Sequence, residues 1–143
     1  MVYMTIKKIQ IISNAISFGP MPEPDTEVEQ RLTINEKGQV WFSRYQFGDG
    51  IGKYELINKE ILHISRETAE EIMKTADDVL NANIDLYATD VGVWELTATD
   101  ACGQKQNKSG SMIYGECEAI DCLCRLIREA LRKNDLFLMD GAQ

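Results

Sequence analysis

Hydrophobic and polar residues alternate along several stretches of the chain, and this period of two is typical of half-buried β-strands. The apolar positions of residues 2–11 change parity at Lys7 and Lys8, so we predict one long strand with a β-bulge at that point. Shorter extended segments are expected at residues 54–57 and 61–64. The first part of the chain is therefore predicted to consist mainly of β-strands.

Two stretches have the pattern of β-hairpins. Residues 27–47 contain the turn 35–38, where asparagine at the first position and glycine at the fourth favour a type I turn followed by a residue at positive φ. A second hairpin has similar turn chemistry at residues 100–103, and its register sets Trp94 opposite Gly110, so that a buried indole lies over the glycine. Its return strand is polar and carries lysines, as expected of an edge strand protected against sheet extension.

Two other segments show the period of amphipathic helices. Ser65 is a good N-cap for the first helix, and a second helix is expected at residues 117–133. A short strand at residues 136–139 completes the series. This order predicts a single α+β domain over residues 1–143, in which a mostly antiparallel twisted sheet of about six strands has two amphipathic helices packed on one face.

The charge of the chain narrows the classes of partner. Its 143 residues include 15 Lys and Arg against 23 Asp and Glu, and nearly all of the net charge of −8 lies in residues 65–143. Because affinity for phosphate backbones and anionic lipids comes from basic side chains, we expect neither nucleic-acid nor membrane binding. The chain has no apolar run of the roughly 20 residues that a membrane span needs. It also has no recognisable secretory signal, so we expect a cytoplasmic protein.

The sequence contains no diagnostic catalytic or cofactor motif. The four cysteines form no C-x-x-C pair, and on a helix Cys117 and Cys124 share a face that Cys122 does not. The glycine-rich run at residues 48–53 is followed by an extended segment, whereas a dinucleotide-binding loop opens a helix. We therefore expect free thiols, no bound metal and no cofactor.

The register of the first hairpin divides its side chains between two faces. If Asn35 pairs with Gln39, the aliphatic residues share one face, which we take as the core side. The other face carries an aromatic row that is either a second core under the proline-rich loop at residues 18–26 or an exposed recognition surface. Two helices are expected to cover only one side of the sheet, which favours the recognition surface. The residues predicted to bind a partner or a second copy are Trp41, Tyr45, Phe47, Arg31 and Glu29.

Titratable residues support a second hypothesis, a small cofactor-free hydrolase that uses Glu95, Asp90 or His63. No nucleophile is marked beside them. A secondary acidic patch is expected at Asp77, Asp78, Asp85 and Asp90. Because the spacing of this patch does not match the EF-hand loop, we interpret it as a solvated surface.

Short motifs of the chain resemble those of a group of small uncharacterised bacterial proteins. The motifs are Asp90-Val-Gly-Val-Trp94, Gly110-Ser111, Asp135-Leu-Phe and Asp140-Gly141. The resemblance covers about residues 40–141. It implies no particular activity.

Together these observations favour a small acidic binding module that acts through its aromatic sheet face or through its acidic second half. An inhibitor or immunity-type protein for a basic protein partner is one concrete form, because complementary electrostatic fields speed association. A cleft with a strongly shifted carboxylate would favour the hydrolase instead.

Overall fold

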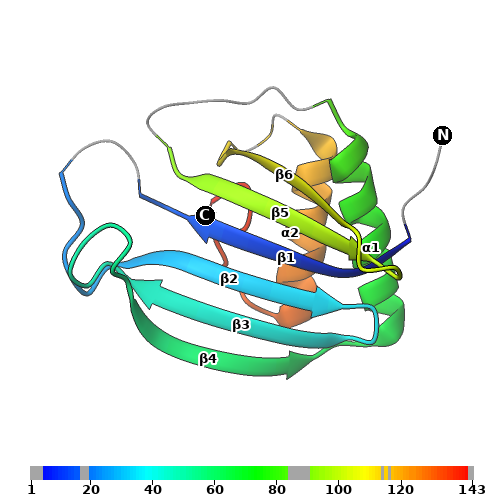
Figure 1. Cartoon of the computed structure of the whole chain (residues 1–143), viewed down its shortest axis with the longest axis horizontal. Helices are drawn as coiled ribbons and strands as arrows, with labels where there is room; N and C mark the ends of the chain where they lie inside the picture. Colours follow the sequence, from blue (N-terminus) through cyan, green and yellow to red (C-terminus); the bar gives the residue numbers. More distant parts are fainter. Residues whose placement is uncertain (1–4, 17–19, 84–90, 114, 116, 142–143) are drawn as a thin grey trace.

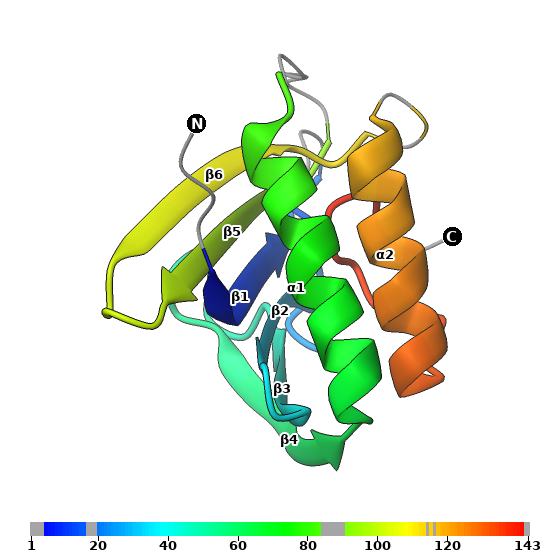
Figure 2. The ribbon, with the colours of Figure 1, turned by 90° about the vertical axis from the view of Figure 1, so that its right-hand side faces the viewer.

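The computed structural model describes residues 5–16, 20–83, 91–113, 115 and 117–141. These residues form a six-stranded antiparallel sheet with two helices on one face, which confirms the predicted α+β class (Figures 1 and 2). In chain order the elements are β1 (Ile6–Asn14), β2 (Glu27–Asn35), β3 (Gln39–Gln46), β4 (Glu55–His63), α1 (Arg66–Asn81), β5 (Val93–Asp100), β6 (Lys105–Ser111) and α2 (Glu118–Leu131).

The strands lie in the order β4-β3-β2-β1-β5-β6, so β4 and β6 are the two edges of the sheet. Strands β1 to β4 form a meander, and α1 then crosses back over the sheet to β5 (Figure 1). The bulge predicted in the first strand is present as a register shift between Ile6 and Lys8, where β1 pairs with β5. The single crossover helix thus covers the inner strands of the sheet.

Both hairpins have the register that their turns predict. Leu32 lies opposite Phe42 in the first hairpin, and Trp94 lies opposite Gly110 in the second. Trp94 is only 2% exposed, and its Nε1 donates a hydrogen bond to the carbonyl oxygen of Ser111 at 3.1 Å. The predicted core position of this indole is therefore confirmed.

The first hairpin departs from the prediction at its open end. A register shift between Glu27 and Glu29 places Glu27 opposite Gln46, where simple counting had expected Val28. The shift allows Glu27 to receive hydrogen bonds from Arg44 of β3. A polar network therefore begins where the alternating pattern placed Val28 opposite Gln46.

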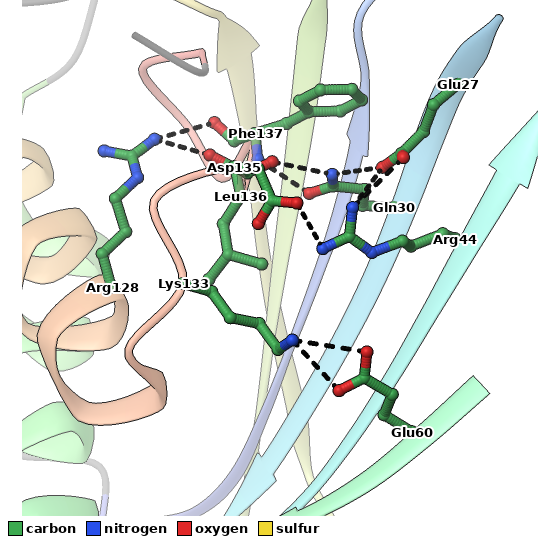
Figure 3. A network of polar contacts seen from close by, with 9 residues as sticks. All are labelled: Glu27, Gln30, Arg44, Glu60, Arg128, Lys133, Asp135, Leu136 and Phe137. Atoms are coloured by element: carbon green, nitrogen blue, oxygen red, sulfur yellow. Dashed lines mark hydrogen bonds and ion pairs between the residues drawn. The ribbon is translucent and has the colours of Figure 1, made fainter. Parts of the chain in front are cut away.

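Strand β4 is continuous, whereas the sequence predicted two separate segments. The polar residues between the two apolar stretches continue the strand alternation, and Glu60 forms an ion pair of 3.1 Å with Lys133, just beyond the end of α2 (Figure 3). A bulge lies in β4 itself, because the adjacent residues Arg44 and Tyr45 of β3 pair with Asn58 and Leu56 and leave Ile57 as the extra residue. Polar side chains that look like a break in the sequence thus lie within an edge strand.

The two helices pack their apolar faces on the sheet. The Ser65 hydroxyl oxygen accepts a hydrogen bond from the backbone N–H of Thr68, which confirms the predicted N-cap of α1. Helix α2 ends earlier than expected because Arg132 adopts a left-handed conformation with φ of 56°. Neither helix in the described ranges is long and apolar enough to cross a membrane. The largest fully buried side chains are Trp94, Phe42, Ile9, Ile11, Ile34, Ile72, Leu96, Ile120, Leu123, Ile127, Leu136 and Leu138.

The strand predicted at residues 136–139 is wrong. This segment is buried but irregular, and Leu138 has a positive φ of 48°. Sheet side chains satisfy its backbone. Gln30 binds both the N–H of Phe137 and the carbonyl of Asp135 (Figure 3). Ser13 donates to the carbonyl of Leu138. Because side chains replace the strand ladder, the apolar run packs into the core without joining the sheet.

Candidate functional site

The sheet has one covered face and one open face. Both helices and the C-terminal segment lie on the same side, and none of the labelled elements covers the other side (Figure 2). Because strand side chains alternate, Leu32 and Phe42 point into the core and their neighbours Arg31 and Trp41 point to the open face. This open face is the side of the sheet that the labelled elements leave uncovered.

The open face carries an apolar row along β3 and β4. Trp41 is 40% exposed and lies directly opposite Ile61, which is 78% exposed. Tyr45 is half-buried and lies opposite the exposed Leu56. The guanidinium carbon of Arg31 lies 4.7 Å from the centre of the Tyr45 ring, a cation–π contact that places a charge at the border of the row. The predicted positions of Trp41, Tyr45 and Arg31 are thus observed, while their role in binding stays a prediction.

Phe47 does not belong to this row. It is only 6% exposed, because β3 ends at Gln46 and the alternation that predicted its orientation ends there. The backbone N–H of Phe47 donates to the carbonyl of Thr26, and its ring lies 6.4 Å from that of Tyr54. Phe47 is therefore a buried residue at the end of the sheet.

Glu29 also differs from its predicted place in a polar rim. It is 8% exposed. Its carboxylate forms an ion pair of 2.8 Å with Arg31 and accepts a hydrogen bond of 3.5 Å from the side-chain amide of Asn14. The Asn14 amide also donates to the hydroxyl of Tyr54 at 3.1 Å. Glu29 is thus a fixed carboxylate within a polar cluster, and the exposed part of Arg31 forms the rim.

A hollow of about 460 Å³ lies beside this cluster, at the same end of the open face. Glu95 of β5 lines it, and among the described residues no cation forms an ion pair with this exposed carboxylate. Glu29 lies between the hollow and the apolar row, because it lines the hollow and is opposite Tyr45 in the register of β2 and β3. Its other lining residues include Ile12, Asn14, Val93, Ser109 and Ser111.

The sequence named Glu95 but did not predict this hollow. The hollow needs side chains from β1, β2, β5 and β6, and their proximity depends on the order of strands in the sheet. The available signal was the small size of the residues at the end of β6. Ser109, Gly110 and Ser111 fill little space beside β5.

Two residues of the hydrolase hypothesis, His63 and Glu95, do not meet in one site. His63 lies in β4 and Glu95 in β5, and β3, β2 and β1 separate these two strands. At a strand spacing of about 4.8 Å, the two residues are roughly 19 Å apart across the sheet. Asp90 lies outside the described residues. An acid–base pair of His63 and Glu95 is therefore excluded by the topology.

The predicted acidic patch is only partly within the described structure. Asp77 and Asp78 lie near the end of α1, on the covered side of the sheet, whereas Asp85 and Asp90 lie outside the described residues. Burial and the neighbouring charge of Asp78 raise the pKa of Asp77. In the parts of the chain that are described, no group of His, Cys, Asp and Glu is arranged to hold a metal ion.

The four cysteines are free thiols in different environments. Cys102 is exposed, Cys117 and Cys122 are half-buried, and Cys124 is fully buried in α2. Burial, together with the charge of Asp140, raises the pKa of the Cys124 thiol to about 12. Cys124 therefore acts as a small core residue at neutral pH.

No family model matches this chain, and no curated protein shows significant similarity to it. The resemblance carried by the short motifs stays a prediction. The function must therefore be argued from the geometry of the open face.

Proposed function

We propose that this chain is a small cytoplasmic binding module that recognises a basic protein partner through the open face of its sheet. The observation that carries the proposal is the exposed pair of Trp41 and Ile61 on a face that no labelled element covers. Tryptophan and tyrosine are enriched at the centres of protein interfaces, where they supply most of the binding energy. An exposed aromatic row lowers the solubility of a protein, and a bound partner removes this cost by covering the row.

The hollow, rather than the whole open face, supports a basic partner. Glu29 and Glu95 line the hollow, whereas the register of the strands places Lys8, Lys59 and Lys105 elsewhere on this face, and Arg31 pairs with Glu29. Since Glu95 has no cation beside it among the described residues, an arginine or lysine of a partner would find an unpaired carboxylate there. The apolar row would then supply affinity, and the hollow would supply specificity.

An inhibitor or immunity-type protein is the concrete form that we favour. Such a protein has to cover a basic surface of its target quickly and tightly, and a net charge of −8 accelerates the encounter with a basic surface. The rigid sheet keeps the aromatic row and the carboxylates in place before binding, which reduces the entropy lost on association.

Affinity capture with matched variants tests this proposal. Four proteins would be immobilised, and the proteins that each of them retains would be compared by quantitative mass spectrometry. They are the wild-type chain, Glu95→Lys, the double variant Trp41→Ser with Tyr45→Ser, and the control Asp78→Lys. We expect a basic protein to be retained by wild type and by Asp78→Lys, and to be lost with the other two variants. With the purified partner, Glu95→Lys should weaken binding at least about tenfold, and wild-type association should slow with added salt.

The control variant also tests the alternative binding surface on the acidic helix side. Asp78 belongs to the acidic helix side, so loss of the partner with Asp78→Lys but not with Glu95→Lys would place binding there and refute the open face. Circular dichroism of each variant would establish that loss of binding is not loss of folding.

A further inference from the structure

The edge strand β4 presents a row of unpaired backbone groups. The N–H of Ile64 donates to the carbonyl of Gly38 at 2.8 Å, which fixes the phase of the ladder between β4 and β3. Along a strand, successive residues direct their N–H and C=O groups to opposite edges. The backbone groups of alternate residues in this part of β4 must therefore point away from the sheet. These residues are Lys59, Ile61 and His63.

Among the described residues, this edge is less protected than the edge at β6, although β4 carries Lys59 and a bulge near its start. Strand β6 is polar and carries two lysines, whereas β4 is nine residues long, contains neither proline nor glycine, and exposes Leu56 and Ile61. Figure 1 shows no labelled element beside β4 on its outer side. A long edge strand with exposed apolar side chains is a template for pairing with another strand.

We propose that β4 pairs in antiparallel orientation with β4 of a second copy, about a two-fold axis that passes between the two Ile61 residues. The pairing would join the two six-stranded sheets into one continuous sheet. Each outward N–H and C=O of the three residues would then find a partner in the other copy. Because the axis is normal to the sheet, the helices of both copies lie on the same side and both open faces remain uncovered.

This register places no two like formal charges of β4 directly opposite each other at neutral pH. With Ile61 opposite Ile61, each Lys59 faces His63 of the other copy, and each Glu60 faces Leu62. A two-fold axis at Lys59 would oppose two lysines, and an axis at Glu60 would oppose two glutamates. Like charges directly opposite each other are destabilising, so these slipped registers are disfavoured.

The apolar residues of the open face also favour a second copy of the chain as the partner of β4. Trp41 lies beside Ile61 within each copy, so the pairing creates a continuous apolar strip of two isoleucines between two tryptophans. Residues 58–63 carry one lysine and one glutamate, and Glu60 pairs with Lys133, so the segment at the contact has no net negative charge of its own. The inference shares Trp41 and Ile61 with the proposed function but does not rest on it, because the unpaired backbone groups of β4 carry it and the hollow near Glu95 lies across the sheet from β4.

The oligomeric state of the full chain tests the proposal directly. We expect light scattering after size exclusion to show a dimer from the micromolar to the near-millimolar range, and Ile61→Lys to be monomeric because it places two ammonium groups at the axis. Ile51→Lys is the matched control, since Ile51 is 67% exposed, against 78% for Ile61, but lies in the loop before β4. A monomeric wild type at every concentration, or equal dissociation by both variants, would overturn the proposal.

Disulfide trapping tests the register. In a Cys102→Ser background, Ile61→Cys should form an intermolecular disulfide on mild oxidation, because Cα atoms of a hydrogen-bonded antiparallel pair are about 5.5 Å apart and within disulfide range. Lys59→Cys, on the same strand and face, should stay monomeric on a denaturing gel because its counterpart is several residues away. Cross-linking of Lys59→Cys at the rate of Ile61→Cys would refute the register. A wild-type dimer that neither variant traps would refute pairing through β4.

Discussion

At the scale of single residues, Gly110 and Trp94 depend on each other. A Cβ atom at position 110 would lie 2.9 Å from Cζ2 of the indole, closer than packed carbon atoms approach. The indole therefore lies flat over a position without a side chain, and its Nε1 reaches the backbone of the next residue, Ser111. A glycine in an edge strand is thus protected from solvent by the largest side chain of the core.

Replacing Trp94 by alanine should destabilise the protein by about 3–5 kcal/mol, through lost burial and the cavity that remains. Gly110→Ala should also be destabilising in the wild type, because the added methyl group overlaps the ring, but it should cost little in the Trp94→Ala background. Urea unfolding of the two single variants and the double variant measures this coupling. Additive effects of the two substitutions would mean that the indole does not lie over Gly110.

The thiols give a second prediction at this scale. The thiolate is the reactive form of cysteine, and a pKa of about 12 leaves almost no thiolate on Cys124 at pH 8. We expect iodoacetamide to modify the exposed Cys102 quickly and to leave Cys124 unmodified until the protein unfolds. Peptide mapping by mass spectrometry after a short native reaction measures both rates. Modification of Cys124 at the rate of Cys102 would show that α2 opens readily.

At the scale of elements, the C-terminal segment is held to the sheet by a chain of charged groups (Figure 3). Arg44 of β3 contacts both Asp135 at 2.7 Å and Glu27 at 3.2 Å. On the other side of the segment, Arg128 of α2 contacts Asp140 at 2.7 Å and the carbonyl of Leu136 at 2.7 Å. These contacts fix a stretch that has no regular secondary structure of its own.

The Arg44–Asp135 pair predicts a dependence of stability on pH. Burial acts to raise the pKa of Asp135, but the hydrogen bond and the charge of Arg44 outweigh it and hold the pKa below its ordinary value of 3.8. A carboxyl with a lowered pKa stabilises the fold above its unfolded pKa and loses this contribution as the pH falls through the folded value. Asp135→Asn should therefore cost less than about 1 kcal/mol near neutral pH, since the carboxylate is largely exposed, and the difference should vanish in acid.

Urea midpoints of wild type and Asp135→Asn between pH 7 and pH 2 test this expectation, because the folded pKa of Asp135 lies below 3.8. Asp49→Asn serves as the control, because Asp49 is an exposed loop residue without an ion pair among the described contacts. A difference that persists unchanged at low pH would mean that the charge of Asp135 does not cause it.

The sequence predicted the elements whose geometry is set locally. The turns at 35–38 and 100–103 fix the hairpin registers, and parity then places Trp41 on the open face. The segment at 136–139 was misread because its apolar run resembles a strand, whereas Gln30, more than a hundred residues away, binds its backbone. Local patterns carry no information on such distant contacts, and the hollow at Glu95 was missed for the same reason.

At the scale of the whole molecule, the two tryptophans report on the two faces of the sheet. Two helices and the C-terminal segment cover the face that contains Trp94, while Trp41 lies on the face that they leave open (Figure 2). A six-stranded sheet of this width cannot be enclosed on both sides by so few elements, so its open face is a consequence of the topology. The proposed dimer widens this open face without covering it.

Acrylamide quenching of single-tryptophan variants tests this asymmetry. In Trp94→Phe, the remaining Trp41 should be quenched readily and should emit at longer wavelength, because it is 40% exposed. In Trp41→Phe, the remaining Trp94 should resist quenching and emit at shorter wavelength. Adding the partner should protect Trp41 and leave the emission of Trp94 unchanged. Protection of Trp41 in the free protein would mean that another part of the chain covers the aromatic row, which would then be a second core, and the open face would lose its role in recognition.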